Sequence, residues 1–389
     1  MNMEGRLTID LERGPDGAGR ATIVSSRPLG VVRALVGRPA NDAVKTLPLL
    51  FNVCGLAQGA AAAQACERAL GVETEPDAGR LRQFLVCMEM LREHLVRVVL
   101  DWQRFLGSEP RSESMLRVMR LCTGARRRLD PGAAAFDIGA GVACDRDRTM
   151  PVIGEAVELV EELVLGEPIG VWSERGVVGD LERWCETGTT AAQKLVSMVL
   201  DRGWASAGGA AVNFLPALSE TELAERLFGA ESGAFVAAPT WNGVPQETSA
   251  LSRQAAGPLV GDVVRSHGHG LLARVVARLV EIARLPGMMS DLVDADEDDE
   301  VHVVDGIPQG RGLAQVEAAR GRLVHGVELN GDVVHRYAIL APTEWNFHAE
   351  GGAARGLADI AGLEGDVRAL AALFVSSVDP CVGYEVRVH

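Results

Sequence analysis

The longest regular pattern in this 389-residue chain lies at 81–106, LRQFLVCMEMLREHLVRVVLDWQRFL. Apolar side chains recur there at spacings of three and four residues over about seven turns, which is the period of an α-helix. Helices of globular proteins average only about three to four turns. The pattern therefore predicts a long helix in the core, around which the rest of the chain has to pack.

Further helices and two hairpins are predicted around it. The Ala-rich run at 55–72 has small side chains that let another backbone come close. Turn-forming residues separate two strand-like runs within 6–25, and Asn330-Gly331 separates two apolar runs later in the chain. Helical spacing also occurs at 112–128, 152–165, 190–201, 219–228 and 271–284. This mixture predicts an α+β fold dominated by helices.

Charge and composition exclude several classes of function. The 53 acidic and 38 basic side chains give a net charge of −15, which opposes a nucleic-acid backbone and an anionic membrane alike. Only 4% of the residues are aromatic, so surfaces for stacking bases are scarce. No apolar stretch reaches the length of a membrane span or a signal peptide. We therefore expect no nucleic-acid partner, no membrane insertion and a cytoplasmic location.

Two segments offer weak metal sites. The stretch 291–300 has seven acidic residues in ten, but it lacks the spacing of a calcium-binding EF-hand, so we expect an exposed loop. His267 and His269 flank one glycine, yet no further His or Cys stands nearby in the sequence.

Cys54 and Cys381 stand out among the seven cysteines. Cys54 precedes the Ala-rich helix, where unpaired backbone N–H groups are expected to lower the pKa of a thiol. Cys381 follows Asp379-Pro380 in a rigid turn close to the C-terminal end. The two thiolates could serve one metal, although a free cysteine taken alone is more often a small core residue.

Four segments, in this order, resemble the motifs of the large subunit of nickel-iron hydrogenases: NVCGLAQGA at 52–60, VEAARGRLVH at 316–325, APTEWNFH at 341–348 and SVDPCVGYEVR at 377–387. The corresponding family motifs are RxCGxCxxxH, EAPRGxLxH, PTxWN and SxDPCxxCxxH. The matches span most of the chain. The resemblance implies a single interleaved domain over 1–389 with a long central helix bundle and small peripheral sheets.

Within that domain the resemblance and the patterns together predict four parts. They are an N-terminal β-hairpin at 1–28, a mainly helical body at 29–290, an acidic loop at 291–306, and a strand-rich segment with a terminal helix and an Asp-Pro-Cys turn at 307–389. The two cysteines lie in the second and fourth parts. The N- and C-terminal segments must therefore meet if the cysteines are to share a metal.

The departures from the family motifs concern the metal ligands. Ala57 and Tyr384 occupy the positions of the cysteines that bridge nickel and iron in the family. A site for two metals needs four soft thiolates, and two remain here. We therefore expect no hydrogen-splitting enzyme and no nickel. Tyr384 is expected to fill the vacated volume, with a partner for its hydroxyl.

Residues around the family's iron are retained. The resemblance places Arg320 and Thr343 beside the cyanide ligands of the iron, as hydrogen-bond donors to the cyanide nitrogens. Glu317 is expected to orient Arg320 through a salt bridge. The expected ligands are thus Cys54 and Cys381 for the metal, with Arg320, Thr343 and Glu317 around the cofactor fragment.

This incomplete ligand set is similar to that of hydrogenase expression/formation proteins of the HupK type. The resemblance implies a maturation scaffold that receives the iron dicyanide carbonyl fragment from the general assembly proteins, holds it transiently and passes it to the precursor of the hydrogenase large subunit. One alternative is a metal-free pseudo-enzyme that docks hydrogenase subunits or assembly proteins. The other is a redox enzyme that uses one metal.

Overall fold

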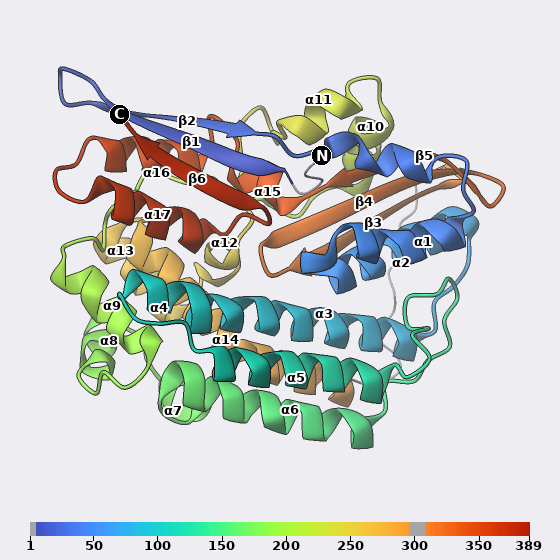
Figure 1. Cartoon of the computed structure of the whole chain (residues 1–389). Coiled ribbons are helices and arrows are strands. Elements are labelled where there is room, and N and C mark those ends of the chain that lie inside the picture. The colour runs from blue at the N-terminus through green and yellow to red at the C-terminus, as the bar shows by residue number, and fades with distance from the viewer. Residues whose placement is uncertain (1–4, 296–307) are drawn as a thin grey trace.

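The computed structural model describes residues 5–295 and 308–389. Figure 1 shows two small sheets on one side of the molecule and a thick layer of helices on the other. The helices before the second sheet are α1 (Ala40–Leu50), α2 (Gly55–Leu70), α3 (Pro76–Val96), α4 (Trp102–Phe105), α5 (Ser112–Leu129), α6 (Arg146–Val160), α7 (Ile169–Ser173), α8 (Val178–Cys185), α9 (Ala191–Asp201), α10 (Glu220–Phe228), α11 (Ser232–Ala237), α12 (Ala250–Gln254), α13 (Pro258–His267) and α14 (Leu271–Asp294). The helices after it are α15 (Pro342–Asn346), α16 (Gly352–Ala361) and α17 (Val367–Val378).

The first sheet joins the two ends of the described chain. The predicted hairpin is present as β1 (Arg6–Arg13) and β2 (Gly19–Ser25), paired antiparallel. A third strand, β6 (Gly383–Val388), pairs parallel with β1 and gives the order β2-β1-β6. The sequence pattern predicted only a turn there. This pairing fixes the segment that carries Cys381 beside the N-terminal region, as sharing a metal requires.

The second sheet packs against the Ala-rich helix. Its strands β3 (Arg311–Ala318), β4 (Gly321–Asn330) and β5 (Val333–Leu340) are antiparallel, with the predicted turn at Gly331 in the left-handed region (φ 64°). Helix α2 lies so close to β3 that a Cβ atom on Gly312 would stand 1.9 Å from the carbonyl oxygen of Ala65. Glycine and alanine therefore set this spacing, which fixes α2 over the sheet.

The predicted long helix is real but is interrupted by a wider turn. Helix α3 begins at Pro76, earlier than expected, and runs through a π-helical turn at Arg97–Asp101 into α4, which ends at Phe105. Both Leu81 and Trp102 are buried, so the apolar spacing reflects a core helix. π-Helical turns are often found at functional sites. This one places Arg97 at the wall of a cavity described below.

Helix α14 is longer than its sequence pattern predicted. It continues beyond residue 284, through Pro286, to Asp294. The expected acidic loop at 291–306 is therefore wrong for 291–294, which form the last helical turn, while 296–307 lie outside the described residues. Within 5–295 and 308–389, no helix is long and apolar enough to cross a membrane.

Candidate functional site

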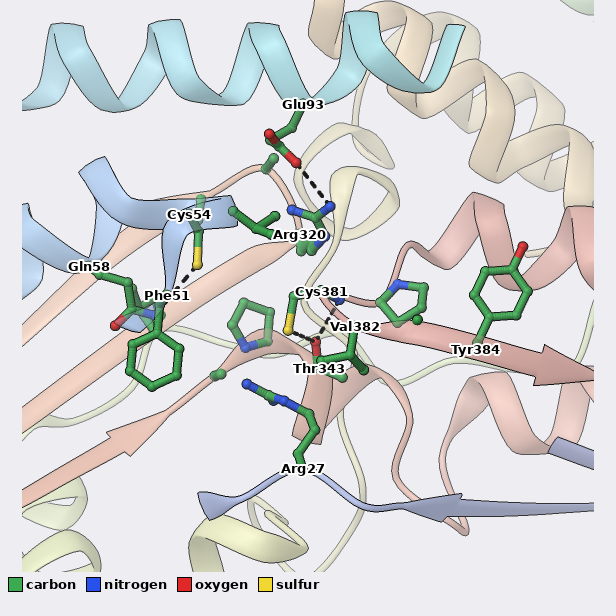
Figure 2. A pocket seen from close by; sticks show the side chains of 18 of the residues that line it. Arg27, Phe51, Cys54, Gln58, Glu93, Arg320, Thr343, Cys381, Val382 and Tyr384 are labelled. Carbon is green, nitrogen blue, oxygen red and sulfur yellow. Dashed lines mark hydrogen bonds and ion pairs between the residues drawn. The ribbon is translucent and has the colours of Figure 1, made fainter. Parts of the chain in front are cut away.

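A cavity of about 950 Å³ opens between the second sheet, α3 and the turn before β6. Four of the five predicted site residues line it: Cys54, Cys381, Arg320 and Thr343. Figure 2 shows both sulfur atoms pointing into this space from different elements. The fold thus brings together residues that are more than three hundred positions apart in the sequence. Glu317, the fifth, is not part of the wall.

Cys54 lies at the N-terminal end of α2, but its environment differs from the expected one. The carboxylate of Glu89, on α3, accepts hydrogen bonds from the backbone N–H groups of Leu56 (2.8 Å) and Ala57 (3.0 Å). Burial, and then the negative charge of Glu89, raise the pKa of the Cys54 thiol to about 12. The predicted lowering of this pKa is therefore wrong, because burial disfavours the charged thiolate and a buried carboxylate already occupies the helix N–H groups.

Glu89 is itself held in an unfavourable place for a charge. Its side chain is 4% exposed, and burial raises its pKa to about 7 despite the two backbone hydrogen bonds and nearby Arg92. A carboxylate with such a pKa changes charge near neutral pH. The wall behind Cys54 therefore gains negative charge as the pH rises through neutrality.

Cys381 is bound to Thr343 through both its side chain and its backbone. The Thr343 hydroxyl donates to Cys381 Sγ at 3.0 Å, and the Cys381 N–H donates to the same hydroxyl oxygen at 3.3 Å. Thr343 is the second residue of α15, directly after β5. These contacts, drawn in Figure 2, fix the direction of the sulfur atom toward the cavity.

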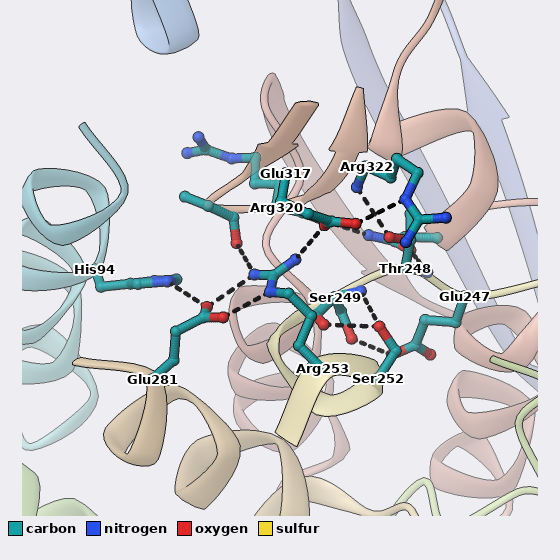
Figure 3. A network of polar contacts seen from close by, with 12 residues as sticks. His94, Glu247, Thr248, Ser249, Ser252, Arg253, Glu281, Glu317, Arg320 and Arg322 are labelled. Atoms are coloured by element: carbon teal, nitrogen blue, oxygen red, sulfur yellow. Dashed lines mark hydrogen bonds and ion pairs between the residues drawn. The ribbon is translucent and has the colours of Figure 1, made fainter. Parts of the chain in front are cut away.

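Arg320 is buried, and its ion-pair partners differ from the predicted one. Its Nη2 donates to Glu93 Oε2 at 3.0 Å, and its Nε lies 3.4 Å from Asp379 Oδ1. Glu317 instead binds Arg322 at 2.7 Å and Arg253 at 3.2 Å, as Figure 3 shows. The predicted salt bridge from Glu317 to Arg320 is therefore wrong. Glu317 and Arg322 stand directly opposite each other on β3 and β4, which explains their pairing.

Asp379 is the centre of a buried charge cluster behind the cavity. Its carboxylate lies 2.7 Å from Arg97 Nη2 and 3.5 Å from Arg278 Nη2, in addition to its contact with Arg320. Burial alone would raise the pKa of Asp379, but the three guanidinium groups lower it well below its usual range. Asp379 also ends α17 with a left-handed backbone (φ 69°). One carboxylate therefore holds three arginines and the start of the Cys381 turn.

Several residues in the cavity wall or behind it were not predicted from the sequence. Arg27, just after β2, lines the cavity and forms an ion pair with Glu344. Gln58 donates from Nε2 to Cys54 Sγ at 3.6 Å. Glu93 and Asp379 bind Arg320. Gln58, Glu344 and Asp379 lie within the motifs that resemble the hydrogenase family, so the sequence could have indicated them. Arg27 and Glu93 lie outside those motifs and carry no sequence signal.

The positions of the family's missing cysteines are filled in two different ways. Ala57 is fully buried in α2. Tyr384 lines the cavity, and its hydroxyl donates to the Ala372 carbonyl at 3.1 Å, which supplies the partner that it was expected to need. In Figure 2 its ring points away from the two sulfur atoms. Cys54 and Cys381 are thus the two cysteines that line the cavity among the described residues.

The two weaker candidate metal sites gain no support from the described residues, and residues 296–300 of the acidic candidate lie outside them. Between 5 and 295 and between 308 and 389, no three His, Cys, Asp or Glu side chains are grouped so as to hold a metal. His269 packs edge-on against Phe214, and His267 Nδ1 lies 3.4 Å from the Ser206 hydroxyl. Among the described residues, the cavity wall therefore presents two thiols, but no cluster of three protein side chains that could hold a metal.

Comparison with curated proteins gives full-length relatives. The chain is 31% identical over 396 residues to the hydrogenase expression/formation protein HupV of Azotobacter chroococcum mcd 1, covering 99% of each chain. It is 31% identical over 395 residues to HupK of Bradyrhizobium diazoefficiens (99% and 98% covered). It is 30% identical over 404 residues to HoxV of Cupriavidus necator (99% and 96% covered). No protein-family model matches the chain.

Solved structures show the same fold at low sequence identity. A NAD⁺-reducing [NiFe]-hydrogenase in the H₂-reduced state superposes with a TM-score of 0.60 at 17% identity, covering 95% of this chain and 93% of that one. The Ni-Fe-Se hydrogenase of D. vulgaris Hildenborough gives 0.60 at 14% identity, with 95% and 94% covered. The helix-dominated, hydrogenase-like architecture expected from the sequence is confirmed.

Proposed function

The chain belongs to the family of hydrogenase expression/formation proteins, and from this premise we propose that it holds the iron dicyanide carbonyl fragment during hydrogenase maturation. The recipient would be the precursor of a hydrogenase large subunit, and the general assembly proteins would supply the fragment. The role is binding and transfer rather than turnover. The observation that carries the proposal is the convergence of Cys54, Cys381, Arg320 and Thr343 on one cavity.

The two thiols suit a metal that arrives with ligands already attached. Two thiolates are too few to complete the coordination of a bare transition metal, but two cyanides and one carbonyl fill further positions on iron. The cavity of about 950 Å³ is large enough to admit such a fragment. A nickel-iron pair would need the two bridging thiolates that Ala57 and Tyr384 replace.

The walls also offer donors for the cyanide nitrogens. Arg320 and Arg27 line the cavity with guanidinium groups, and each is held in place by a carboxylate, Glu93 or Glu344. A guanidinium presents several N–H groups, so it can bind a cyanide while it keeps its carboxylate partner. The Thr343 hydroxyl, close to Cys381, adds a neutral donor.

Weak binding fits a carrier better than tight binding. The Cys54 thiol, with its pKa raised to about 12 by burial, must lose its proton before it binds a metal. That cost lowers the affinity at neutral pH. A recipient with four thiolates holds the iron more tightly, so transfer toward it is favourable.

The test is infrared spectroscopy of protein purified without oxygen from cells that contain the assembly proteins. We expect bands of bound cyanide and carbonyl together with iron. Cys54→Ala and Cys381→Ala should each abolish the bands. Cys185→Ala, which removes a thiol outside this cavity, should keep them. Wild-type protein without iron and without bands would contradict the proposal.

One observation favours the alternative of metal-free docking: burial of the sulfur atom and the charge of Glu89 raise the pKa of the Cys54 thiol to about 12, which opposes the thiolate that a metal needs. In that case, a strain whose chromosomal copy carries both cysteine-to-alanine changes would still mature its hydrogenase. The scaffold role requires that strain to lose hydrogenase activity while its large-subunit precursor accumulates.

A further inference from the structure

A continuous chain of buried hydrogen bonds runs from the second sheet to the Cys54 sulfur. Tyr337 Oη lies 2.9 Å from His325 Nδ1, and His325 Nε2 lies 2.9 Å from Gln58 Oε1. Gln58 Nε2 then lies 3.6 Å from Cys54 Sγ, the contact drawn as a dashed line in Figure 2. Side chains from β5, β4 and α2 are thus connected in one line to Cys54, which directly precedes α2.

The three members that lead to Cys54 are shielded from water, while Cys54 itself is partly exposed. His325 is 0% exposed, Gln58 2% and Tyr337 6%. Burial lowers the pKa of His325 to about 3 and raises that of Tyr337 well above its usual value. His325 is therefore neutral, with one N–H group, and Tyr337 keeps its O–H proton. Each link has one donor and one acceptor, so all the links must donate toward the same end of the chain.

The links between Tyr337, His325 and Gln58 can all donate toward Cys54 or all donate toward Tyr337. The hydroxyl of Tyr337 decides between these two arrangements. If Tyr337 donates to His325 Nδ1, then Nε2–H donates to Gln58 Oε1, and the Gln58 NH₂ group faces the sulfur. In the reverse direction His325 Nδ1–H would point at the Tyr337 oxygen. The tyrosine O–H would then lack an acceptor, because His325 is its one hydrogen-bond partner among the described residues. A buried donor without a partner costs about 1–3 kcal/mol, which favours the first direction.

We propose that His325 and Tyr337 fix the Gln58 amide so that it donates an N–H hydrogen bond to the Cys54 sulfur. They are positioning residues for the metal-binding thiol, an assignment that rests on the proposed function. A hydrogen bond to a metal-bound thiolate withdraws charge from the sulfur. The relay thus weakens the thiolate as a donor to iron, which suits a site that must give its iron away.

The direction of the chain can be measured without iron. Nitrogen-15 NMR of histidine in the full-length, metal-free protein distinguishes a protonated from an unprotonated ring nitrogen. We expect His325 with Nε2 protonated and Nδ1 accepting a hydrogen bond. Tyr337→Phe should produce a mixture of both tautomers, because Gln58 becomes free to turn. The chain has two tyrosines, so Tyr384→Phe is the matched control and should leave the His325 signals unchanged.

The effect on the metal is measured by infrared spectroscopy of the loaded protein. Gln58→Met keeps the side-chain length but removes the donor, so the thiolate should push more charge onto iron and the carbonyl band should move to lower wavenumber. Tyr337→Phe should move it in the same direction by less. An unmoved band in Gln58→Met, or a wild-type His325 protonated at Nδ1, would overturn the relay. Wild-type protein without bands would instead refute the proposed function, and the NMR result would still decide the direction of the chain.

Discussion

The two cysteines face one cavity from walls of different chemistry. Cys54 stands on a wall that we call neutral because the side chains leading to its sulfur are uncharged; behind it, Arg92 pairs with Glu89, whose pKa is raised to about 7 by burial. Cys381 stands beside a charged wall, where Asp379 binds three arginines. We infer from this difference that the charged wall maintains the shape of the site, while the neutral wall adjusts the chemistry of the Cys54 sulfur. Changes in the two walls should therefore have different consequences.

The largest effect is expected at the charged wall. Asp379→Asn keeps the side-chain shape, and asparagine tolerates the left-handed backbone, but buried Arg278 loses its carboxylate partner, and Arg97 and Arg320 each lose one of two. We expect a loss of about 3–5 kcal/mol in the free energy of unfolding, measured by urea denaturation. Asp366→Asn, at the other end of α17, is the matched control, because asparagine can still cap the helix. Equal losses in both variants would remove the distinction between the walls.

On the neutral wall, Glu89 should make stability depend on pH. Its pKa is raised from the usual 4.5 to about 7, so its contribution is full below pH 4.5 and is lost as the pH rises through 7. Between pH 5 and pH 8 the wild type should lose about 2.5 kcal/mol relative to Glu89→Gln, which cannot ionise. Denaturation curves at the two pH values measure this difference. Parallel pH profiles for both proteins would show that Glu89 ionises freely.

The smallest effect is expected at Thr343. Thr343→Val keeps the shape but removes the hydroxyl that donates to Cys381 Sγ and accepts from the Cys381 N–H. We expect a loss of about 1 kcal/mol in stability. Thr343→Ser keeps both contacts and should retain the infrared spectrum of the loaded wild type. A spectrum that Thr343→Val leaves unchanged would exclude this hydroxyl from fragment binding.

Local patterns predicted much of the fold, because they depend on neighbours in sequence. Helical spacing indicated the long helix at 81–106, and Asn330-Gly331 indicated a hairpin turn that the structure contains. Strand β6 was missed because it is short and its partner, β1, lies at the opposite end of the chain. The order of the motifs identified Cys54 and Cys381, although no local pattern could show that they face one cavity.

Electrostatic partners were harder to predict, since they follow from the packed structure. Glu317 was predicted to pair with Arg320 because they are close in sequence. Strand pairing instead places Glu317 opposite Arg322, which donates to its carboxylate. Arg320 finds Glu93 on a helix 227 positions away. The thiol of Cys54 was expected to be acidic at a helix start, but a carboxylate from another helix takes the N–H groups there.

The central claim is that both cysteines bind one iron. Iron-edge X-ray absorption of the protein, purified without oxygen, counts the sulfur atoms around that metal directly. We expect two sulfur ligands at about 2.3 Å, the usual length of a metal–thiolate bond, together with the carbon atoms of cyanide and carbonyl. The sulfur count should fall to one, or the iron should be lost, in Cys54→Ala and in Cys381→Ala. Iron bound without sulfur, or with a sulfur count that neither variant changes, would contradict the account.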